Sequence, residues 1–251
     1  PHCTSGQTLM NNEFWKNQRV IITGGTSGLG KALARQLDEF GARVVIIARN
    51  QAALEQTVKG TNIYPIQADV SNKFDIHRIS GEALGVLGGI DVLFNNASYL
   101  GEAPLKLLLD TECEDLEQVL ATNLVGPFRL TKALVPSMLM EGNGTVINIS
   151  SDAAVSAYPQ WGSYSVSKAA IDHLSRIWQE ELSEHGIRFL AIDPGDMHTP
   201  MHMAAIPDAD PEDLYNPADV AINLLAFLTT PSSQQQVRYS SQEWNQLEAT
   251  L

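Results

Sequence analysis

Three side chains in the second half of the chain have residue types and a spacing that suit proton transfer. Tyr164 and Lys168 lie four residues apart in a stretch of helical periodicity, so we expect them on one face of a helix. A tyrosine has a reference pKa of about 10, and a neighbouring ammonium lowers that pKa by stabilising the phenolate. Ser151 directly follows an apolar, strand-like run, and its hydroxyl is placed to share a carbonyl oxygen with the phenol. Together the three residues predict acid/base chemistry at a carbonyl or alcohol oxygen.

Each of these signals has an ordinary structural explanation when it stands alone. A serine after a strand is commonly a turn residue, and a Tyr-x-x-x-Lys pair is commonly part of a helix surface. A second, independent motif elsewhere in the chain is therefore needed to favour the catalytic interpretation.

A glycine-rich turn near the N-terminus supplies that second motif, because it predicts a phosphate site. The apolar run Val20–Ile22 precedes the spaced glycines Gly24, Gly28 and Gly30, and a helical pattern follows. Glycines at a strand-to-helix turn let the backbone approach a ligand, and the start of the helix offers N–H groups to an anion. A turn without a ligand is the alternative. The stretch also resembles a P-loop, but Ala32 stands where that motif needs a hydroxyl group to bind Mg²⁺. The P-loop interpretation is therefore excluded.

Apolar runs alternate with helical patterns along the chain, and this alternation positions both motifs. We interpret as strands residues 20–22, 44–47, 63–68, 91–94, 145–149 and 187–192, and as helices residues 31–40, 51–58, 73–87, 112–140 and 161–185. Pro127 and Pro136 are possible breaks in the 112–140 helix. The alternation predicts an α/β fold, a Rossmann-type doubly wound parallel sheet with helices on both faces, whose strand ends and ligand share one edge. We expect one domain over residues 11–251, after a flexible arm or expression remnant over residues 1–10, with Met10 as the natural start.

Charge and composition exclude several kinds of partner. The chain of 251 residues carries 16 Lys and Arg against 29 Asp and Glu, and its net charge of −13 would repel nucleic acid and anionic membranes. Cys3 and Cys113 lie far apart without a His/Cys cluster, which supports neither a disulfide framework nor a metal site. No apolar run reaches the ~18 residues that span a bilayer, and no export signal is present. We therefore predict a cytoplasmic protein without a nucleic-acid or membrane partner.

The ordered motifs of the chain resemble those of the short-chain dehydrogenase/reductase family over roughly residues 14–230. These motifs are TGGTSGLG (Thr23–Gly30), Asn95-Asn96-Ala97, Asn123, Ser151, Tyr164-x-x-x-Lys168 and Pro194-Gly195. The resemblance implies a sheet of about seven strands in the order 3-2-1-4-5-6-7 and a nicotinamide dinucleotide as cofactor. It also implies that Tyr164 is the general acid/base and that Lys168 binds the nicotinamide ribose and lowers the pKa of Tyr164. Ser151 would orient the substrate oxygen, and Asn123 would hold a water that links Lys168 to solvent.

The same resemblance assigns the contacts of the dinucleotide. The residues expected around it, besides Tyr164 and Lys168, are Gly24, Ser27, Gly28 and Leu29 at the phosphates and adenosine ribose, Asp69 and Val70 at adenine, Asn95 and Ala97 in the ribose region, and Pro194, Gly195 and Thr199 toward the nicotinamide. Ala48 stands where NAD-preferring members carry an acid, and Arg49 follows it. Because a guanidinium pairs with a phosphate, this favours NADP(H) over the alternative, NAD(H). A solvated charge at the end of the strand is the other interpretation of Arg49.

Residues 197–217 correspond to the substrate lid of the family. Between Arg188 and Arg238 the sequence has seven acids and neither Lys nor Arg, so we expect a pocket that disfavours highly anionic substrates. Trp161, Met197 and Met201 are the candidate apolar contacts of a small carbonyl or alcohol substrate, and packing of the lid is the alternative role for them.

The helices near residues 112–140 and 161–185 correspond to the family's dimer interface, so we expect a homodimer or homotetramer. Val237–Ser241 departs from the Gly-rich ending common in relatives, which weakens the expectation of assembly beyond a dimer.

The sequence as a whole predicts an NADP(H)-dependent oxidoreductase that interconverts a carbonyl and an alcohol, with Tyr164 moving the proton. The alternatives are a family member that reduces C=C bonds or performs non-redox chemistry, and a non-catalytic nucleotide sensor. The set of Ser151, Tyr164 and Lys168 favours carbonyl chemistry, because a sensor would need the glycine turn but neither Tyr164 nor Lys168.

Overall fold

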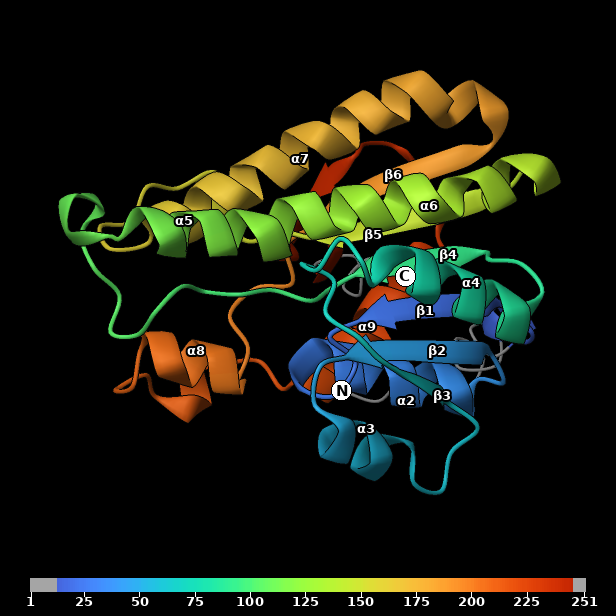
Figure 1. The fold of residues 1–251 in the computed structure, drawn as a ribbon, viewed down its shortest axis with the longest axis horizontal. Helices are drawn as coiled ribbons and strands as arrows, with labels where there is room; N and C mark the ends of the chain where they lie inside the picture. The colour runs from blue at the N-terminus through green and yellow to red at the C-terminus, as the bar shows by residue number, and fades with distance from the viewer. Residues whose placement is uncertain (1–12, 246–251) are drawn as a thin grey trace.

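The computed structural model describes residues 13–245, which contain a parallel seven-stranded sheet (Figure 1). The strands are β1 (Arg19–Thr23), β2 (Arg43–Ala48), β3 (Tyr64–Gln67), β4 (Val92–Asn95), β5 (Gly144–Ile149), β6 (Ile187–Ile192) and β7 (Arg238–Tyr239). Their order in the sheet is β3-β2-β1-β4-β5-β6-β7, which confirms the predicted topology. The order reverses between β1 and β4, the place where doubly wound sheets bind ligands beyond the carboxyl ends of their strands. The predicted arm over residues 1–10 lies outside the described residues.

Both faces of the sheet are buried under helices. On β1, Val20 and Ile22 belong to one apolar layer and Ile21 to the other, and β2 alternates in the same way. Helices α2 (Gly28–Glu39), α3 (Gln51–Val58) and α9 (Pro217–Leu228) cover the first face, and α4 (Ile76–Leu87), α6 (Gly126–Glu141) and α7 (Gly162–Leu182) cover the second (Figure 1). Burial on both faces explains why the central strands are apolar at nearly every position.

The predicted 112–140 helix is a continuous helix with a π-helical turn near its centre. α5 (Cys113–Leu120) leads into the turn Ala121–Val125, and α6 follows. Pro127 is the second residue of α6, and because it has no N–H, the carbonyl of Asn123 cannot receive the ordinary α-helical hydrogen bond. A π turn in a helix is frequent at functional sites. Pro136 lies inside α6 without ending it.

Two predicted elements are shorter than the sequence suggested. α4 begins at Ile76 rather than at residue 73, because the preceding residues form a turn in which the Asp75 N–H donates to the Asn72 carbonyl. β3 is restricted to Tyr64–Gln67 and contains Pro65, which is tolerated because β3 is an edge strand. Within the described part of the chain, helices long and apolar enough to cross a membrane are absent.

The predicted lid forms a loop whose two ends meet. Met197 and Tyr215 form a parallel bridge, the His198 N–H lies 2.9 Å from the Tyr215 carbonyl, and the Tyr215 N–H lies 2.9 Å from the Asp196 carbonyl. Between these ends lies α8 (Pro200–Ala205), which stands apart at the lower left of Figure 1. The bridge therefore holds the two ends of the loop together between β6 and α9.

Candidate active site

A cavity of about 610 Å³ opens at the carboxyl ends of the strands. Its lining includes nearly all the residues singled out from the sequence, which are Gly24, Ser27, Gly28, Leu29, Arg49, Asp69, Val70, Ala97, Ser151, Trp161, Tyr164, Lys168, Pro194, Gly195, Met197, Thr199 and Met201. Asn95 and Asn123 are the two exceptions. Segments from the whole length of the fold therefore converge on one site of a size typical for a small-molecule pocket.

The glycine turn forms one end of this cavity and fits a phosphate. Gly24 and Gly28 have φ values of +66° and +48°, which favour glycine over other residues. A Cβ atom on Gly30 would lie 2.2 Å from the Gly24 carbonyl oxygen, so only glycine permits this close turn. Ser27 precedes α2 without a side-chain capping bond, and the first turn of α2 has no acidic side chain. The helix start thus presents backbone donors and no competing carboxylate to an anion.

Thr23 and Asn96 lock this turn to the loop after β4. The Thr23 hydroxyl oxygen accepts hydrogen bonds from the N–H groups of Asn96 and Ala97, at 3.0 and 2.9 Å. The Asn96 amide in turn donates to the carbonyls of Thr23 and Gly24, at 3.1 and 3.2 Å. The ribose region predicted around Ala97 is therefore held in register with the phosphate turn.

The Asn95 side chain lies outside the cavity lining, and its contact with the dinucleotide stays a prediction. The side chain is 5% exposed, and its amide donates to Asn148 at 2.8 Å and to Thr131 at 3.2 Å. Successive side chains of a strand point to opposite faces, so Asn95 points into the layer beneath α6, and Asn96 reaches the cavity instead.

Asp69, Val70 and Arg49, which the sequence predicts near adenine, line the cavity together. The Asp69 carboxylate accepts hydrogen bonds from the N–H and the hydroxyl of Ser71, at 2.9 and 2.7 Å, so it shapes the local turn. Arg49 is exposed at the end of β2, and its guanidinium forms no salt bridge with a carboxylate among residues 13–245. It is an uncompensated positive charge at the rim.

Tyr164 and Lys168 lie next to each other on α7. The Lys168 ammonium lies 5.4 Å from the centroid of the Tyr164 ring and donates to the Ile149 carbonyl at 2.8 Å. Lys168 is 3% exposed, and burial lowers its pKa to about 8, although Asp172 acts in the opposite direction. Burial also raises the pKa of Tyr164 to about 12, while hydrogen bonds with Ser151 and Ser98 lower it. In the protein alone the pKa of Tyr164 is therefore raised, opposite to the sequence expectation, which included the positive charge of a bound nicotinamide.

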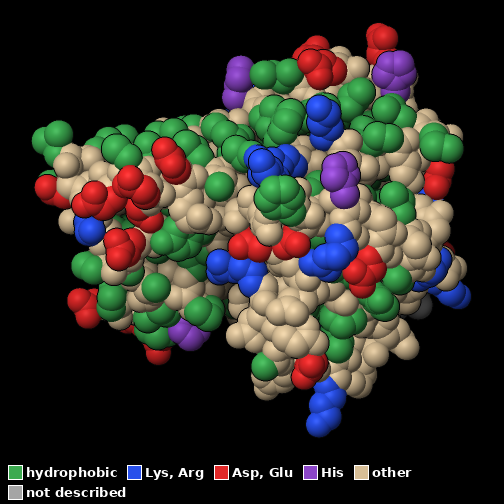
Figure 2. Space-filling model, viewed as in Figure 1, with side chains coloured by type: hydrophobic (Ala, Val, Ile, Leu, Met, Phe, Trp, Pro, Cys, Tyr) green, Lys and Arg blue, Asp and Glu red, His purple; other side chains and the backbone are tan. Residues whose placement is uncertain are grey.

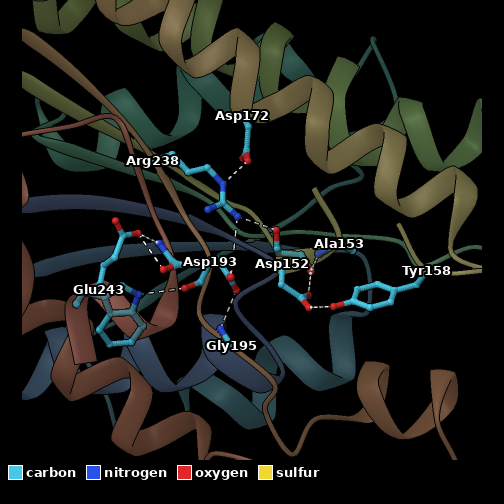
Figure 3. A network of polar contacts seen from close by, with 11 residues as sticks. Asp152, Ala153, Tyr158, Asp172, Asp193, Gly195, Arg238 and Glu243 are labelled. Atoms are coloured by element: carbon cyan, nitrogen blue, oxygen red, sulfur yellow. Dashed lines mark hydrogen bonds and ion pairs between the residues drawn. The ribbon is translucent and has the colours of Figure 1, made fainter. Parts of the chain in front are cut away.

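Ser151 lies at the end of β5 with its hydroxyl in the site. It caps a short 3₁₀ turn, where its hydroxyl oxygen accepts a hydrogen bond from the Ala153 N–H at 3.1 Å. The same hydroxyl lies 3.1 Å from a carboxylate oxygen of Asp152, whose other oxygen accepts from Tyr158 at 2.6 Å (Figure 3). Ser151 also lies close enough to Tyr164 to lower the pKa of the phenol, so the two groups can act on the same substrate atom.

Asn123 supports the site from behind instead of lining it. Its side chain is 2% exposed, accepts from the Tyr99 N–H at 2.7 Å, and donates to the Tyr99 carbonyl and the Ser167 hydroxyl, both at 2.9 Å. Ser98 donates to the same amide oxygen at 3.2 Å. The Asn123 side chain is thus fully used in joining the loop after β4 to α7, and any catalytic role falls to its backbone.

The lid side of the cavity carries the predicted substrate contacts. The rings of Trp161 and Tyr164 meet edge to face with centroids 5.7 Å apart, and Met197 and Met201 also line the cavity. The Thr199 hydroxyl caps α8 by accepting from the His202 N–H at 3.2 Å, while its methyl group packs against Gly28, 3.1 Å from where a Cβ atom of that residue would lie. An apolar side chain therefore lies directly beside Tyr164.

Arg238 is a residue of the site that the sequence interpretation did not assign. Its side chain links Asp172 of α7, the Ser151 carbonyl and Asp193 beyond β6 (Figure 3). One feature of the sequence draws attention to this segment, since Val237–Ser241 departs from the Gly-rich ending of relatives. Its partners lie 66 and 87 residues away along the chain, so no local pattern reveals them.

The fold and the site define a nucleotide-dependent oxidoreductase on a Rossmann-type sheet, and comparison with known proteins specifies its class. A family model described as short chain dehydrogenase matches residues 18–210. The chain is 33% identical over 188 residues to 2-(R)-hydroxypropyl-CoM dehydrogenase of Xanthobacter autotrophicus, and this match covers 72% of this chain and 75% of that enzyme. It is 34% identical over 185 residues to L-fucose dehydrogenase of Mus musculus, and this match covers 72% of this chain and 66% of that enzyme.

Solved structures agree with these sequence matches. A 3-ketoacyl-(acyl-carrier-protein) reductase from Brucella melitensis, solved with NADH, superimposes with a TM-score of 0.81 at 25% identity, over 92% of this chain and 99% of that one. The chain belongs to the short-chain dehydrogenase/reductase family.

Proposed function

We propose that the protein is an NADP(H)-dependent oxidoreductase that interconverts a carbonyl compound and its alcohol. One observation carries this proposal. The Ser151, Tyr164 and Lys168 side chains share a cavity with the glycine turn that fits a dinucleotide phosphate. A nucleotide sensor would need the turn alone, and the set at the other end of the cavity supports catalysis instead.

The chemistry divides between the dinucleotide and the chain. When bound, NADPH supplies the hydride that reaches the carbonyl carbon. Tyr164 donates its proton to the substrate oxygen, and Ser151 donates a hydrogen bond to the same oxygen. Loss of that proton leaves a phenolate beside the buried Lys168, and the low local dielectric strengthens their attraction. An ammonium beside a phenolate raises the pKa of Lys168 and lowers that of Tyr164, so such pairing opposes both shifts that burial causes.

A proton must then return to Tyr164 from solvent. We assign this step to a water held by the backbone carbonyl of Asn123, the carbonyl that Pro127 leaves without its α-helical donor. The Asn123 side chain fixes the position of that turn through Tyr99 and Ser167. Asn123 is therefore proposed as a positioning residue for the relay that ends at Lys168.

Arg49 is the basis for preferring NADP(H). A 2′-phosphate bound at the end of β2 would meet an exposed guanidinium that forms no salt bridge with a carboxylate within residues 13–245, and no acid occupies position 48. The Brucella relative was solved with NADH, so the family alone does not decide the cofactor.

The substrate is proposed to be small, in part apolar and not strongly anionic. Trp161, Met197 and Met201 supply the apolar wall. Asp152 and Asp196 lie at the same end of the cavity, and Figure 2 shows acidic side chains at the left of the view, around α5 and α8. Such a field disfavours phosphorylated or carrier-bound substrates.

We further propose a homodimer or homotetramer through α6 and α7. Apolar side chains stand exposed on these helices, namely Phe128, Leu139, Met140, Val166 and Ile177. Apolar side chains also gather over α5 and α6 in Figure 2. Val166→Arg should reduce the molecular mass measured by light scattering to that of the monomer, whereas Val155→Arg, at another exposed valine, should not. An unchanged mass for Val166→Arg would contradict this interface.

The catalytic proposal is tested by following NADPH oxidation against a panel of neutral aldehydes and ketones. The wild type should reduce at least one compound, and Ser151→Ala should lower kcat by roughly 100-fold, as expected on losing one oxyanion donor. The absence of turnover across the panel, in a protein that binds NADPH, would favour the sensor instead.

A further inference from the structure

Arg238 joins three elements that surround the catalytic residues. It lies on the two-residue strand β7, where it pairs with Ala191 of β6. Its Nε atom donates to Asp172 Oδ2 at 2.6 Å, and its Nη2 atom donates to the Ser151 carbonyl oxygen at 3.1 Å (Figure 3). The same Nη2 atom lies 4.0 Å from Asp193 Oδ2. One guanidinium therefore contacts the helix that carries Lys168 and the backbone of Ser151.

These contacts complete a frame around the end of β5. Lys168 donates to the carbonyl of Ile149, and Arg238 donates to the carbonyl of Ser151. Asp172 follows Lys168 by one helical turn on the same face of α7. Two cations thus hold the carbonyls on either side of Ser150, and α7 fixes both cations. The direction of the Ser151 hydroxyl depends on that backbone.

Charge makes Arg238 necessary at this place. The side chain of Asp172 is 5% exposed, and its Oδ1 atom has no hydrogen-bond partner among the described residues. Arg238 supplies the cation paired with this carboxylate, and its own side chain is 15% exposed. The other charged groups that face Arg238 are Asp193 beyond β6 and Glu243 of α10 (Ser241–Asn245). A buried carboxylate without its partner is strongly unfavourable.

The contacts need an arginine and not simply a positive charge. The guanidinium is planar and rigid, and it presents Nε and Nη2 to acceptors on two different elements. A lysine carries one nitrogen on a flexible stem, so Arg238→Lys preserves the charge and loses one of the two contacts.

We propose that Arg238 is a positioning residue that holds Ser151 in its catalytic orientation by coupling it to Asp172 and α7. The consequence for catalysis rests on the proposed carbonyl chemistry. The consequence for the position of Ser151 does not, and it can be measured by itself.

A double-mutant cycle tests whether Arg238 acts through Ser151. Arg238→Lys should lower kcat by about tenfold, since small displacements of catalytic groups cost this much or more. The Kd for NADPH should change by less than about twofold, because coupled residues affect the shared step only. In the Ser151→Ala background, Arg238→Lys should have little further effect on kcat. An equal fold-loss in both backgrounds would overturn the proposal, because it would show independent, additive effects.

Arg19→Lys is the matched control for loss of an arginine–aspartate pair. Arg19 pairs with Asp91 through Nε at 2.9 Å and is similarly buried, but it lies at the amino ends of the strands, away from the cavity. This variant should lower the thermal midpoint while leaving kcat unchanged. If Arg238→Lys does not fold, Arg238→Met combined with Asp172→Leu removes both charges, and the same cycle is measured with that pair.

A crystal structure of Arg238→Lys separates this proposal from the proposed function. The Ser151 hydroxyl should lose its hydrogen bond with the Ala153 N–H, and the Ser151 carbonyl should rotate. An unchanged Ser151 would overturn the inference even if the enzyme is active. If the wild type reduces no carbonyl compound, the proposed function fails, and the position of Ser151 in this crystal alone decides the role of Arg238.

Discussion

The ammonium of Lys168 lies 5.4 Å from the centre of the Tyr164 ring, and burial shifts the pKa values of the two groups toward their neutral forms. The pKa of Lys168 falls to about 8 and that of Tyr164 rises to about 12. In the protein without a ligand the phenol therefore stays protonated, and the two groups form no ion pair. Transfer of the phenol proton to a substrate oxygen creates the pair, because a phenolate stabilises the ammonium beside it.

The lowered pKa of Lys168 predicts a pH dependence of stability. Below about pH 8 the folded protein keeps Lys168 charged in a buried site, which costs stability, and the unfolded chain holds that proton up to its ordinary pKa near 10.5. Stability of the wild type relative to Lys168→Met should therefore rise as the pH increases from about 8 toward 10, by roughly 1.4 kcal/mol for each unit of the shift that is traversed.

Urea unfolding of both proteins at pH 7.5, 8.5 and 9.5, without dinucleotide, measures this difference. The tyrosine shift acts in the opposite direction, because a raised pKa lowers stability as the pH rises above about 10, so the window stops there. A difference between the two proteins that is flat from pH 7.5 to 9.5 would show that Lys168 is not desolvated.

Arg49→Asp should reverse the preference for the phosphorylated cofactor. The guanidinium lost would have formed charge-assisted hydrogen bonds with a 2′-phosphate, and the new carboxylate would repel that phosphate. The ratio of kcat/KM for NADPH to that for NADH should fall by at least about tenfold. Arg35→Asp, at an exposed arginine of α2 outside the cavity lining, makes the same charge change and should leave the ratio unaltered. Equal ratios for wild type and Arg49→Asp would remove Arg49 from the account.

Gly30→Ala should damage both the turn and dinucleotide binding. The added Cβ atom would lie 2.2 Å from the Gly24 carbonyl oxygen and 2.4 Å from the Asn96 amide nitrogen, so the backbone of the turn must move. We expect a loss of stability of about 1–3 kcal/mol and a weaker Kd for NADPH.

Gly81→Ala is the matched control for this substitution, because Gly81 also lies inside a helix and has open space around its Cβ position. It should stabilise the protein by about 0.5–1 kcal/mol without changing NADPH binding. Fluorescence titration with NADPH and urea unfolding measure both effects. Tight NADPH binding by Gly30→Ala would contradict the assignment of the turn.

The sheet could be predicted from the sequence because its strands are buried on both faces. Val44–Ile47 shows this most directly, since a run of four branched apolar residues satisfies both layers at once. The positions of Tyr164 and Lys168 followed from helical spacing, which is local. The direction in which a side chain points was harder to predict, as Asn95 and Asn96 show. The face to which each side chain points depends on where the strand ends.

Other features depended on contacts that the sequence does not show. The π turn at Asn123 follows from Pro127 combined with packing against the loop after β4, and a proline by itself predicts only a break. Arg238 is a similar case, because its role depends on Asp172 and Ser151 meeting at one guanidinium. The pKa of Tyr164 depends on burial that only the assembled fold produces.

The role of Tyr164 is the central claim, and Tyr164→Phe tests it most directly. The substitution removes one hydroxyl and keeps the ring that contacts Trp161. With the best carbonyl substrate from the panel, the account predicts that kcat for NADPH oxidation falls by at least about 100-fold, as expected on loss of a general acid, while the Kd for NADPH stays within about twofold of the wild type, since the ring and Lys168 remain in place. Equal kcat values for Tyr164→Phe and wild type would contradict the account.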